Sequence, residues 1–533
     1  MTEFIDNLFL DKTLIFEKDH KQLCMNSSTL YELHAGILDL KANQILLNEN
    51  IVYEFIFTID CSGSMSDKCS DGRSKMQHIV HTLTNMINYF KTNSILKVFI
   101  TVNAFDNKIY NIVERTSINN NNIQSILDKI NSIQPRDCTN IELALNSVRN
   151  TIEQIKNMYS EHNISHIFMT DGEITKGSAD YHYLSSLVDR SITNIFIGFG
   201  LEHDSVLLNY LSDGENSAYY FIDKLENSGL VYGEILHGII YKLLYDVKIN
   251  VQNGLIYDFK KNIWASSLEI GEIVGEANKI YHLISSNPTS CDVRIFAKKS
   301  SDNSEVDIKI VVTNQDTNQD LTKYIYRQKT LQHLFLVKDF LRRRSDKKNM
   351  SNNEYLFGYE NESPSFKEEE KMLRENLSKF LEELKIYMKD NALNDDNFLK
   401  NLCDDIYITF RTFTTRYGAM FVTSRQTTQG TQRCYTVGNT IDTDMNNTKI
   451  PKLNLKRSDN YVSDSNSNGN SNNDNYFSDS NNDSFWDIEH EVSNVADAPY
   501  LTPGATQMMR EISNNNNNNN IFTQQLEEET QVL

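Results

Sequence analysis

Three oxygen-bearing side chains follow an apolar run in the first part of the chain. Residues 55–59 (Phe-Ile-Phe-Thr-Ile) lead directly into Asp60, Ser62 and Ser64. A continuously apolar strand is typical of the centre of a parallel sheet covered on both faces, and open α/β sheets bind ligands at the carboxyl ends of such strands. One carboxylate and two hydroxyls are hard oxygen donors, which Mg²⁺ accepts alongside water. The pattern therefore predicts a metal-binding loop, in which Gly63 allows a tight turn.

Residues 60–65 (Asp-Cys-Ser-Gly-Ser-Met) resemble the first loop of the metal ion-dependent adhesion site in von Willebrand factor A (vWA) domains. Two later segments resemble the other loops of that site, namely residues 135–145, which contain Thr139, and residues 166–173, which contain Asp171. The resemblance implies one Mg²⁺ or Mn²⁺, bound directly by the hydroxyls and directly or through water by the acids. The implied ligands are Asp60, Ser62, Ser64, Thr139 and Asp171.

Two other interpretations of these residues remain open. The serines and acids could form an ordinary hydrogen-bonded loop in which the serines cap the following helix. Cys61, Cys69 and Cys138 could bind a soft metal or oxidise, but their spacing matches no zinc pattern and favours unpaired thiols. We interpret the segment as a hard-metal site because oxygen donors follow or precede three separate elements.

Composition excludes several classes of partner. The 533 residues include 52 Lys plus Arg and 72 Asp plus Glu, which gives a formal charge of -20. This balance argues against nucleic acid and against binding to a membrane through a basic surface. The sequence shows no secretory signal and no apolar run long enough to span a membrane, so we expect no membrane insertion. Seven scattered cysteines, an odd number, favour reduced thiols and an intracellular, cytoplasmic location.

Residues 51–245 alternate between strand and helix patterns, which predicts a doubly wound, mostly parallel α/β sheet of Rossmann-like type. This is the vWA domain that the resemblance implies. The expected helices cover residues 75–90, 123–133, 140–158, 181–191, 205–211 and 225–242. The expected strands cover residues 52–59, 96–105, 165–169, 194–200 and 219–221, and residues 110–113 form an antiparallel edge.

In residues 246–320 the strand and helix patterns no longer alternate, and apolar residues recur with a period of two. Short apolar strands are separated there by Asn, Gly, Ser and Pro. We expect a β-sandwich there. Residues 29–50 contain strand patterns that do not belong to the vWA order, and we expect them to join the sandwich. The vWA domain would then be inserted within the sandwich domain. Residues 1–28 show no clear period and are treated as an N-terminal extension.

Residues 321–440 are predicted to be helical. Within them, residues 416–421 (Arg-Tyr-Gly-Ala-Met-Phe) resemble part of the VWaint architecture of intein-like vWA proteins and a plant group of vWA ubiquitin ligases. Residues 441–533 are rich in Asn, Ser and Asp and too poor in apolar residues to offset the entropy of folding, so we expect a disordered tail.

These observations favour a binding module over an enzyme. No base accompanies the predicted metal loop at a recognisable spacing, no RING-type Cys/His array is present, and His162-Asn163 lies within the vWA pattern rather than at a splice junction. We expect capture of a protein partner through an Asp or Glu side chain that completes the metal coordination. The alternative is a scaffold that binds through its sandwich, helices or tail, with the metal structural or absent.

Overall fold

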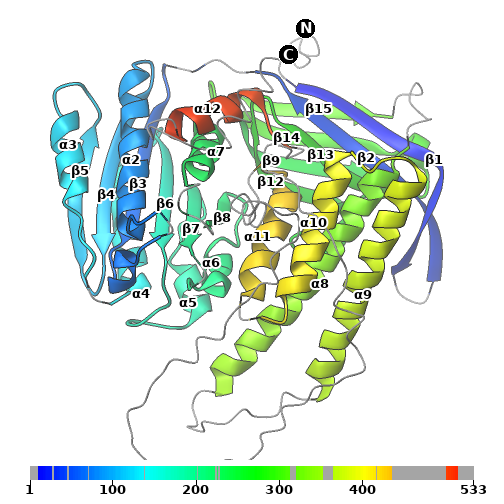
Figure 1. The fold of residues 1–533 in the computed structure, drawn as a ribbon. Helices are drawn as coiled ribbons and strands as arrows, with labels where there is room; N and C mark the ends of the chain where they lie inside the picture. The colour runs from blue at the N-terminus through cyan, green and yellow to red at the C-terminus, as the bar shows by residue number, and fades with distance from the viewer. Residues whose placement is uncertain are drawn as a thin grey trace, which may run out of the picture.

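The computed structural model describes residues 10–434 and 500–513, except for gaps at 27–28, 45–46, 48, 70, 137, 201, 223–224, 226–227, 313–319, 352–363 and 416. These residues form an α/β domain, a pair of antiparallel sheets and a group of long helices (Figure 1). The predicted fold class is confirmed.

The α/β domain is built on a sheet of strand order β5-β4-β3-β6-β7-β8, as far as the described residues show. All neighbouring strands are parallel except β5, which runs antiparallel to β4 at one edge. The bounds are β3 (Val52–Asp60), β4 (Lys97–Phe105), β5 (Ile109–Ser117), β6 (Asn163–Thr170), β7 (Thr193–Phe199) and β8 (Ser217–Ile222). Because Asp60 pairs with Phe105 and Ile59 with Met169, the central strands end at one level and bring their following loops together.

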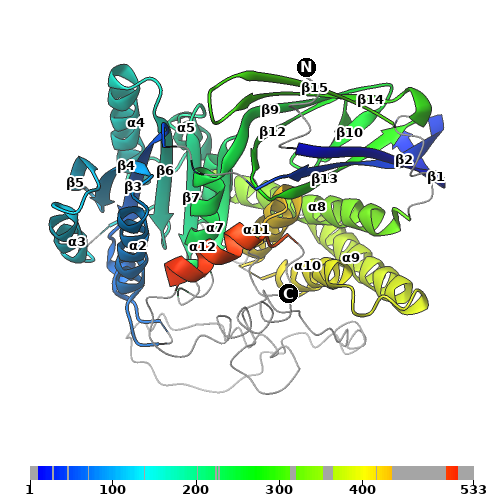
Figure 2. The same cartoon turned by 90° about the horizontal axis from the view of Figure 1, so that it is seen from above.

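Helices cover both faces of this sheet, which explains why β3 is buried along almost its whole length. Figure 2 shows the two helical layers on opposite sides of the strands. One layer contains α2 (Lys75–Thr92), α3 (Ile123–Asn131) and α7 (Ser228–Ile240), and the other contains α4 (Ile141–Met158), α5 (Tyr181–Ser186) and α6 (Ser205–Leu211). Ser74 begins α2 with a capping box, in which its side chain and that of Gln77 each accept a backbone N–H of the other residue.

The two antiparallel sheets have the orders β1-β2-β13-β10-β11 and β12-β9-β14-β15 among the described residues. Their bounds are β1 (Leu10–Asn26), β2 (Thr29–Ala42), β9 (Lys242–Gln252), β10 (Leu255–Asp258), β11 (Ile263–Ala265), β12 (Ser267–Val274), β13 (Asn278–Ser285), β14 (Asp292–Lys299) and β15 (Glu305–Val311). Strand β2 pairs with β13, so the α/β domain is inserted between two strands of one sheet. The N-terminal extension, residues 1–28, contains β1, although its sequence shows no clear period that would predict a strand.

The helical region consists of α8 (Thr322–Ser351), α9 (Pro364–Asp390), α10 (Asn397–Thr412) and α11 (Gly418–Thr431). It packs on the β8 edge of the α/β domain, where the rings of Phe221 and Phe421 meet edge-to-face at 5.5 Å. Arg425 and Asp405 form an ion pair of 2.7 Å between α11 and α10, and both side chains are fully buried. None of the helices within the described ranges is long and apolar enough to cross a membrane.

Helix α12 (Pro503–Ser513) differs from the prediction of disorder for residues 441–533. It lies along α7 and beside α2 (Figure 2). Met508 and Met509 are buried in the core of the α/β domain, together with Ala505 and Ile512. The expectation of disorder is wrong for this helix, because these four apolar residues lie on one helical face and the polar average of the region conceals them.

The contact between α12 and α7 depends on a small residue. A Cβ atom at Gly233 of α7 would lie 2.5 Å from the Met509 Cα atom, so a larger residue would force the two helices apart. Asn85 of α2 donates a hydrogen bond of 2.8 Å to the Ile512 carbonyl oxygen and holds the end of α12. The remainder of the predicted tail, residues 441–499 and 514–533, lies outside the described residues.

Candidate metal centre

The loop after β3 is held in place by its own backbone. The Cys61 N–H donates to the Phe105 carbonyl at 2.8 Å and continues the β3–β4 pairing by one residue. The Ser62 N–H then turns back to donate to Asp60 Oδ1 at 2.8 Å. Residues Gly63–Ser66 form a short 3₁₀ helix. These contacts leave Asp60 fully buried at the end of β3 and Ser64 half-buried at the surface.

Hydroxyl and carboxylate groups from two loops meet at this point. Ser64 Oγ donates to Asp171 Oδ1 at 2.8 Å, although the two residues are 107 positions apart in the chain. The Ser62 and Ser64 hydroxyl oxygens lie 3.1 Å apart. Asp171 follows β6 and is fully buried. The structure therefore brings together four of the five predicted ligands through direct contacts.

Thr139 reaches the same place from the loop before α4. Its backbone is fixed by Thr175, whose N–H donates to the Thr139 carbonyl at 3.1 Å and whose Oγ1 accepts the Thr139 N–H at 2.7 Å. A Cβ atom at Gly172 would lie 3.4 Å from Thr139 Oγ1 and 3.8 Å from Ser64 Oγ. Gly172 thus separates the two hydroxyls without filling the space between them.

Two further residues at the centre, Thr170 and Lys75, are not indicated by the sequence pattern of the predicted ligands. Thr170 donates from Oγ1 to Asp60 Oδ2 at 2.6 Å, and Lys75 donates from Nζ to Asp171 Oδ2 at 2.6 Å. The position of Thr170, directly before Asp171 at the end of a strand, is a signal that could have identified it. Lys75 carries no comparable signal, because the insertion of residues 66–74 separates it from the loop and only the fold brings it back.

The surroundings of the two acids favour a cation. Burial raises the pKa of Asp60 to about 6, against the hydrogen bonds from Thr170 and Ser62, and the nearby Asp171 charge raises it further. An ion between the two carboxylates would offset both the burial and their mutual repulsion. Lys75 supplies one positive charge to Asp171, at a site where its own side chain is only 14% exposed.

The donor set fits a hard divalent cation. The described residues contain no cluster of three or more His, Cys, Asp or Glu side chains that could bind a metal, so binding here would depend on the hydroxyls of Ser62, Ser64 and Thr139 and on water. Both Asp60 oxygens already accept hydrogen bonds, which suits a carboxylate that reaches a metal through water. Two carboxylates with hydroxyl and water oxygens are typical ligands of Mg²⁺.

Cys61, next to Asp60 in the loop, does not change this chemistry. Cys61 Sγ donates to the Phe105 carbonyl at 3.2 Å and points into the core. Burial raises the pKa of the Cys61 thiol to about 12, and the charges of Asp106 and Asp60 add to that effect. Since the thiolate is the form that binds soft metals, Cys61 is unsuited to that role.

Comparison with protein families matches residues 55–173 to the von Willebrand factor type A domain. The chain contains a vWA domain. The matched segment runs from the middle of β3 to just beyond β6 and includes all five predicted ligands. Among curated proteins, no sequence match to the chain is found.

Solved structures of vWA proteins are similar to this chain at low sequence identity. A von Willebrand factor type A protein from Catenulispora acidiphila is 13% identical, covering 63% of this chain and 82% of its own, with a TM-score of 0.44. The ArnB paralog VWA2 from Sulfolobus acidocaldarius is also 13% identical, covering 79% of this chain and 99% of its own, with a TM-score of 0.44. Proximal thread matrix protein 1 from the mussel byssus, solved with a zinc-occupied MIDAS motif, is 18% identical, covering 34% of this chain and 46% of its own, with a TM-score of 0.28. The VWaint resemblance of residues 416–421 stays a prediction.

Replacing Lys75 by Met is expected to strengthen Mg²⁺ binding by up to about tenfold, because the ammonium group competes with a metal for Asp171. Calorimetric titration of the full chain with MgCl₂ measures this affinity. Lys156→Met is the matched control, since Lys156 pairs with Asp189 at 2.6 Å away from the centre. Weaker binding in Lys75→Met would show that Lys75 holds Asp171 in position and does not compete.

Proposed function

We propose that this protein is a protein-binding module that holds one Mg²⁺, or Mn²⁺, at its vWA centre and captures an acidic side chain of a partner. The residues that would hold the ion are Asp60, Ser62, Ser64, Thr139 and Asp171. A bound ion with few charged protein ligands retains an electrophilic, exchangeable position that a partner carboxylate can fill.

One observation carries this proposal. Side-chain oxygens from three loops converge at the carboxyl end of the sheet, and the link between Ser64 and Asp171 joins two of those loops directly. The two acids are fully buried, whereas Ser64 and Gly172 are half-buried and lie toward solvent. A partner can therefore approach the hydroxyl side of the centre while the carboxylates stay protected.

The surrounding residues support binding rather than catalysis. Among the described residues, the groups that hydrogen-bond to the acids are the Thr170 hydroxyl, the Ser62 N–H, the Ser64 hydroxyl and the Lys75 ammonium. Hydroxyl donors and an ammonium orient and neutralise carboxylates, but they do not form a base poised beside a nucleophile. We therefore propose no reaction for this centre.

Partner capture with and without the metal tests the proposal. The full chain is immobilised, incubated with extract of its native host in Mg²⁺ or in EDTA, and crosslinked before mass spectrometry. We expect partners retained in Mg²⁺ to be lost in EDTA and in the Ser62→Ala/Ser64→Ala double variant. Ser132→Ala is the matched control, since the Ser132 hydroxyl donates to the Lys129 carbonyl at 2.6 Å far from the centre.

The acidic side chain is tested on the partner. Changing every Asp and Glu in the mapped contact segment to Asn or Gln should abolish Mg²⁺-dependent capture. Capture that survives EDTA, the double serine variant and these changes would instead support the scaffold function, in which the sandwich, helices or tail bind the partner.

A further inference from the structure

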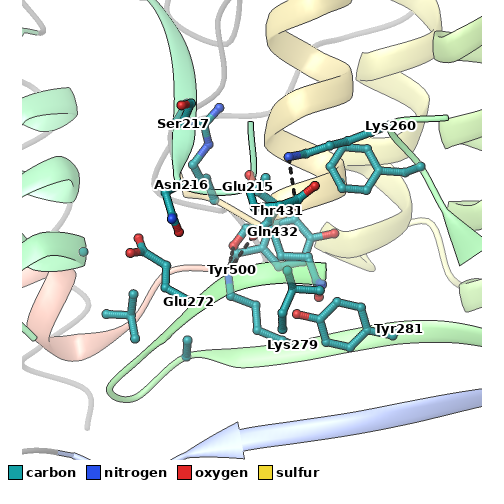
Figure 3. A pocket seen from close by; sticks show the side chains of 18 of the residues that line it. Glu215, Asn216, Ser217, Lys260, Glu272, Lys279, Tyr281, Thr431, Gln432 and Tyr500 are labelled. Atoms are coloured by element: carbon teal, nitrogen blue, oxygen red, sulfur yellow. Dashed lines mark hydrogen bonds and ion pairs between the residues drawn. The ribbon is translucent and has the colours of Figure 1, made fainter. Parts of the chain in front are cut away.

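A cavity of about 390 Å³ lies where the vWA domain, the sandwich and the helical region meet (Figure 3). Its walls come from the edge strand β8 and helix α7 of the vWA domain, from β12 and β13 of the sandwich, and from α8 and the end of α11. This volume falls within the range of small-molecule sites, which are commonly found between domains. The cavity does not include any of the five candidate metal ligands.

Several acidic side chains that line the cavity are neutralised by neighbouring lysines. Glu272 lies 2.6 Å from Lys242, and Glu215 lies 3.4 Å from Lys260. Asp258 is similarly paired with Lys261 at 3.4 Å. A further acid, Glu234, accepts a hydrogen bond of 2.6 Å from the Cys434 N–H. Three of these acids are therefore balanced by lysines, and the Glu234 charge acts on Lys279, whose pKa it raises.

Three basic side chains of the wall lack such partners. Within the described ranges, Arg327, Arg433 and Lys279 have no carboxylate within 4.0 Å. Arg327 is only 2% exposed, and its terminal nitrogens donate to the carbonyls of Ile280 at 2.8 Å and Gln429 at 2.6 Å. Its Nε atom is buried without a hydrogen-bond acceptor. A buried guanidinium with neutral partners keeps its full charge uncompensated.

Arg433, which follows α11, repeats this arrangement. Its guanidinium lies 3.9 Å from the centre of the Tyr220 ring, and its Nη2 donates to the Tyr219 carbonyl at 2.9 Å. The Nε and Nη1 atoms are buried without acceptors. Two arginines that line one cavity thus carry buried donors without acceptors.

Lys279 completes the cluster. Its Nζ donates to the carbonyls of Thr431 at 2.6 Å and Gln432 at 3.0 Å, as Figure 3 shows, which leaves one of its three protons available. Burial lowers the pKa of Lys279 to about 8. Cys434 and the Glu234 charge raise it in part, whereas the charges of Arg433 and Arg327 lower it further. The three cations are therefore close enough to repel one another.

We propose that this cavity binds a small organic anion whose carboxylate or phosphate group lies among Arg327, Arg433 and Lys279 and whose apolar body lies against the remaining wall. Charge-assisted hydrogen bonds from guanidinium groups suit both oxyanions. The apolar part of the wall includes Ile239, Tyr281 and Leu331. This site is independent of the metal centre and of the proposed capture of a protein partner.

The test uses the full chain and four probes, namely phenyl phosphate, benzoate, citrate and inorganic phosphate, with phenol as the neutral analogue. Calorimetry measures binding to the chain after treatment with EDTA and dialysis into metal-free buffer without EDTA, so that neither the metal centre nor the chelator contributes. At least one anionic probe should bind, and phenol should not. Arg433→Gln should weaken that binding by about tenfold or more, the expected loss of a charge-assisted hydrogen bond.

Arg294→Gln is the matched control, because Arg294 forms an exposed pair with Asp307 on the sandwich, and it should leave binding unchanged. Circular dichroism without probe reports whether each variant folds, and Lys279→Gln replaces Arg433→Gln if the latter unfolds. Absence of binding by all four anions, or equal binding by wild type and the cavity variant, overturns the proposal.

Discussion

The Asp60→Asn variant is expected to bind Mg²⁺ at least about 100-fold more weakly than the wild type. The change removes one of the two buried carboxylates and so the charge that draws a divalent cation to the loop. The amide has the same size as the carboxylate, and its oxygen can still accept the Ser62 N–H. A similar size is needed because position 60 is fully buried. Calorimetric titration of the full chain with MgCl₂ gives both affinities.

A neighbouring acid provides the control for this prediction. Asp106 follows β4, is 3% exposed, and accepts hydrogen bonds from the Lys108 N–H at 2.7 Å and the Tyr110 hydroxyl at 3.1 Å. It is therefore a buried carboxylate at the same edge of the sheet but outside the ligand set. Asp106→Asn should bind Mg²⁺ like the wild type. Equal affinity of the wild type and Asp60→Asn would refute the metal centre.

The second large effect is expected in the helical region. Arg425→Met should destabilise the packing of α10 against α11 by about 3–5 kcal/mol, the usual cost of leaving a buried charge without its partner. Burial already raises the pKa of Asp405 to about 7, although the Arg425 charge lowers it. Without that charge, Asp405 must take up a proton in the folded state or the helices must open to water.

Hydrogen exchange measured by mass spectrometry tests the loss of α10–α11 packing. A local measurement is needed because a chain of several domains does not unfold in a single step. Peptides from α10 and α11 should exchange faster in Arg425→Met, and the Arg425→Met/Asp405→Leu double variant should recover protection. Arg294→Met is the control, since the Arg294–Asp307 pair is about half-exposed and contributes about 0–1 kcal/mol. Unchanged protection in Arg425→Met would show that the buried pair is not needed for packing.

The α/β core could be predicted from the sequence because its signals are local. An apolar run of strand length marks β3, and apolar residues at spacings of three and four mark α2 and α4. Strand and helix then alternate, which leaves a doubly wound sheet as the consistent solution. The carboxyl ends of parallel strands meet at one edge, so Asp60 and Asp171 could be placed together from the sequence alone.

Short or irregular elements were harder to predict. Strands β11 and β12 are separated by a single residue and carry few alternating apolar positions, and β1 depends on pairing with β2 rather than on its own pattern. Helix α12 lies within a region whose average composition is polar. Its four apolar residues are buried only because they pack against α7 and α2. In each case the stabilising contact comes from a distant part of the chain.

The sequence by itself determined the oxygen donors of the metal centre, since their types, order and positions at strand ends are written in three short segments. Only the tertiary structure decided that Lys75 neutralises Asp171 and that Thr170 orients Asp60, because these pairs are 96 and 110 positions apart. The cavity likewise depends on tertiary structure, since Arg327, Arg433 and Lys279 belong to separate elements. Charges so far apart in sequence can be brought together only by the packing of three domains, and that packing has no local signature.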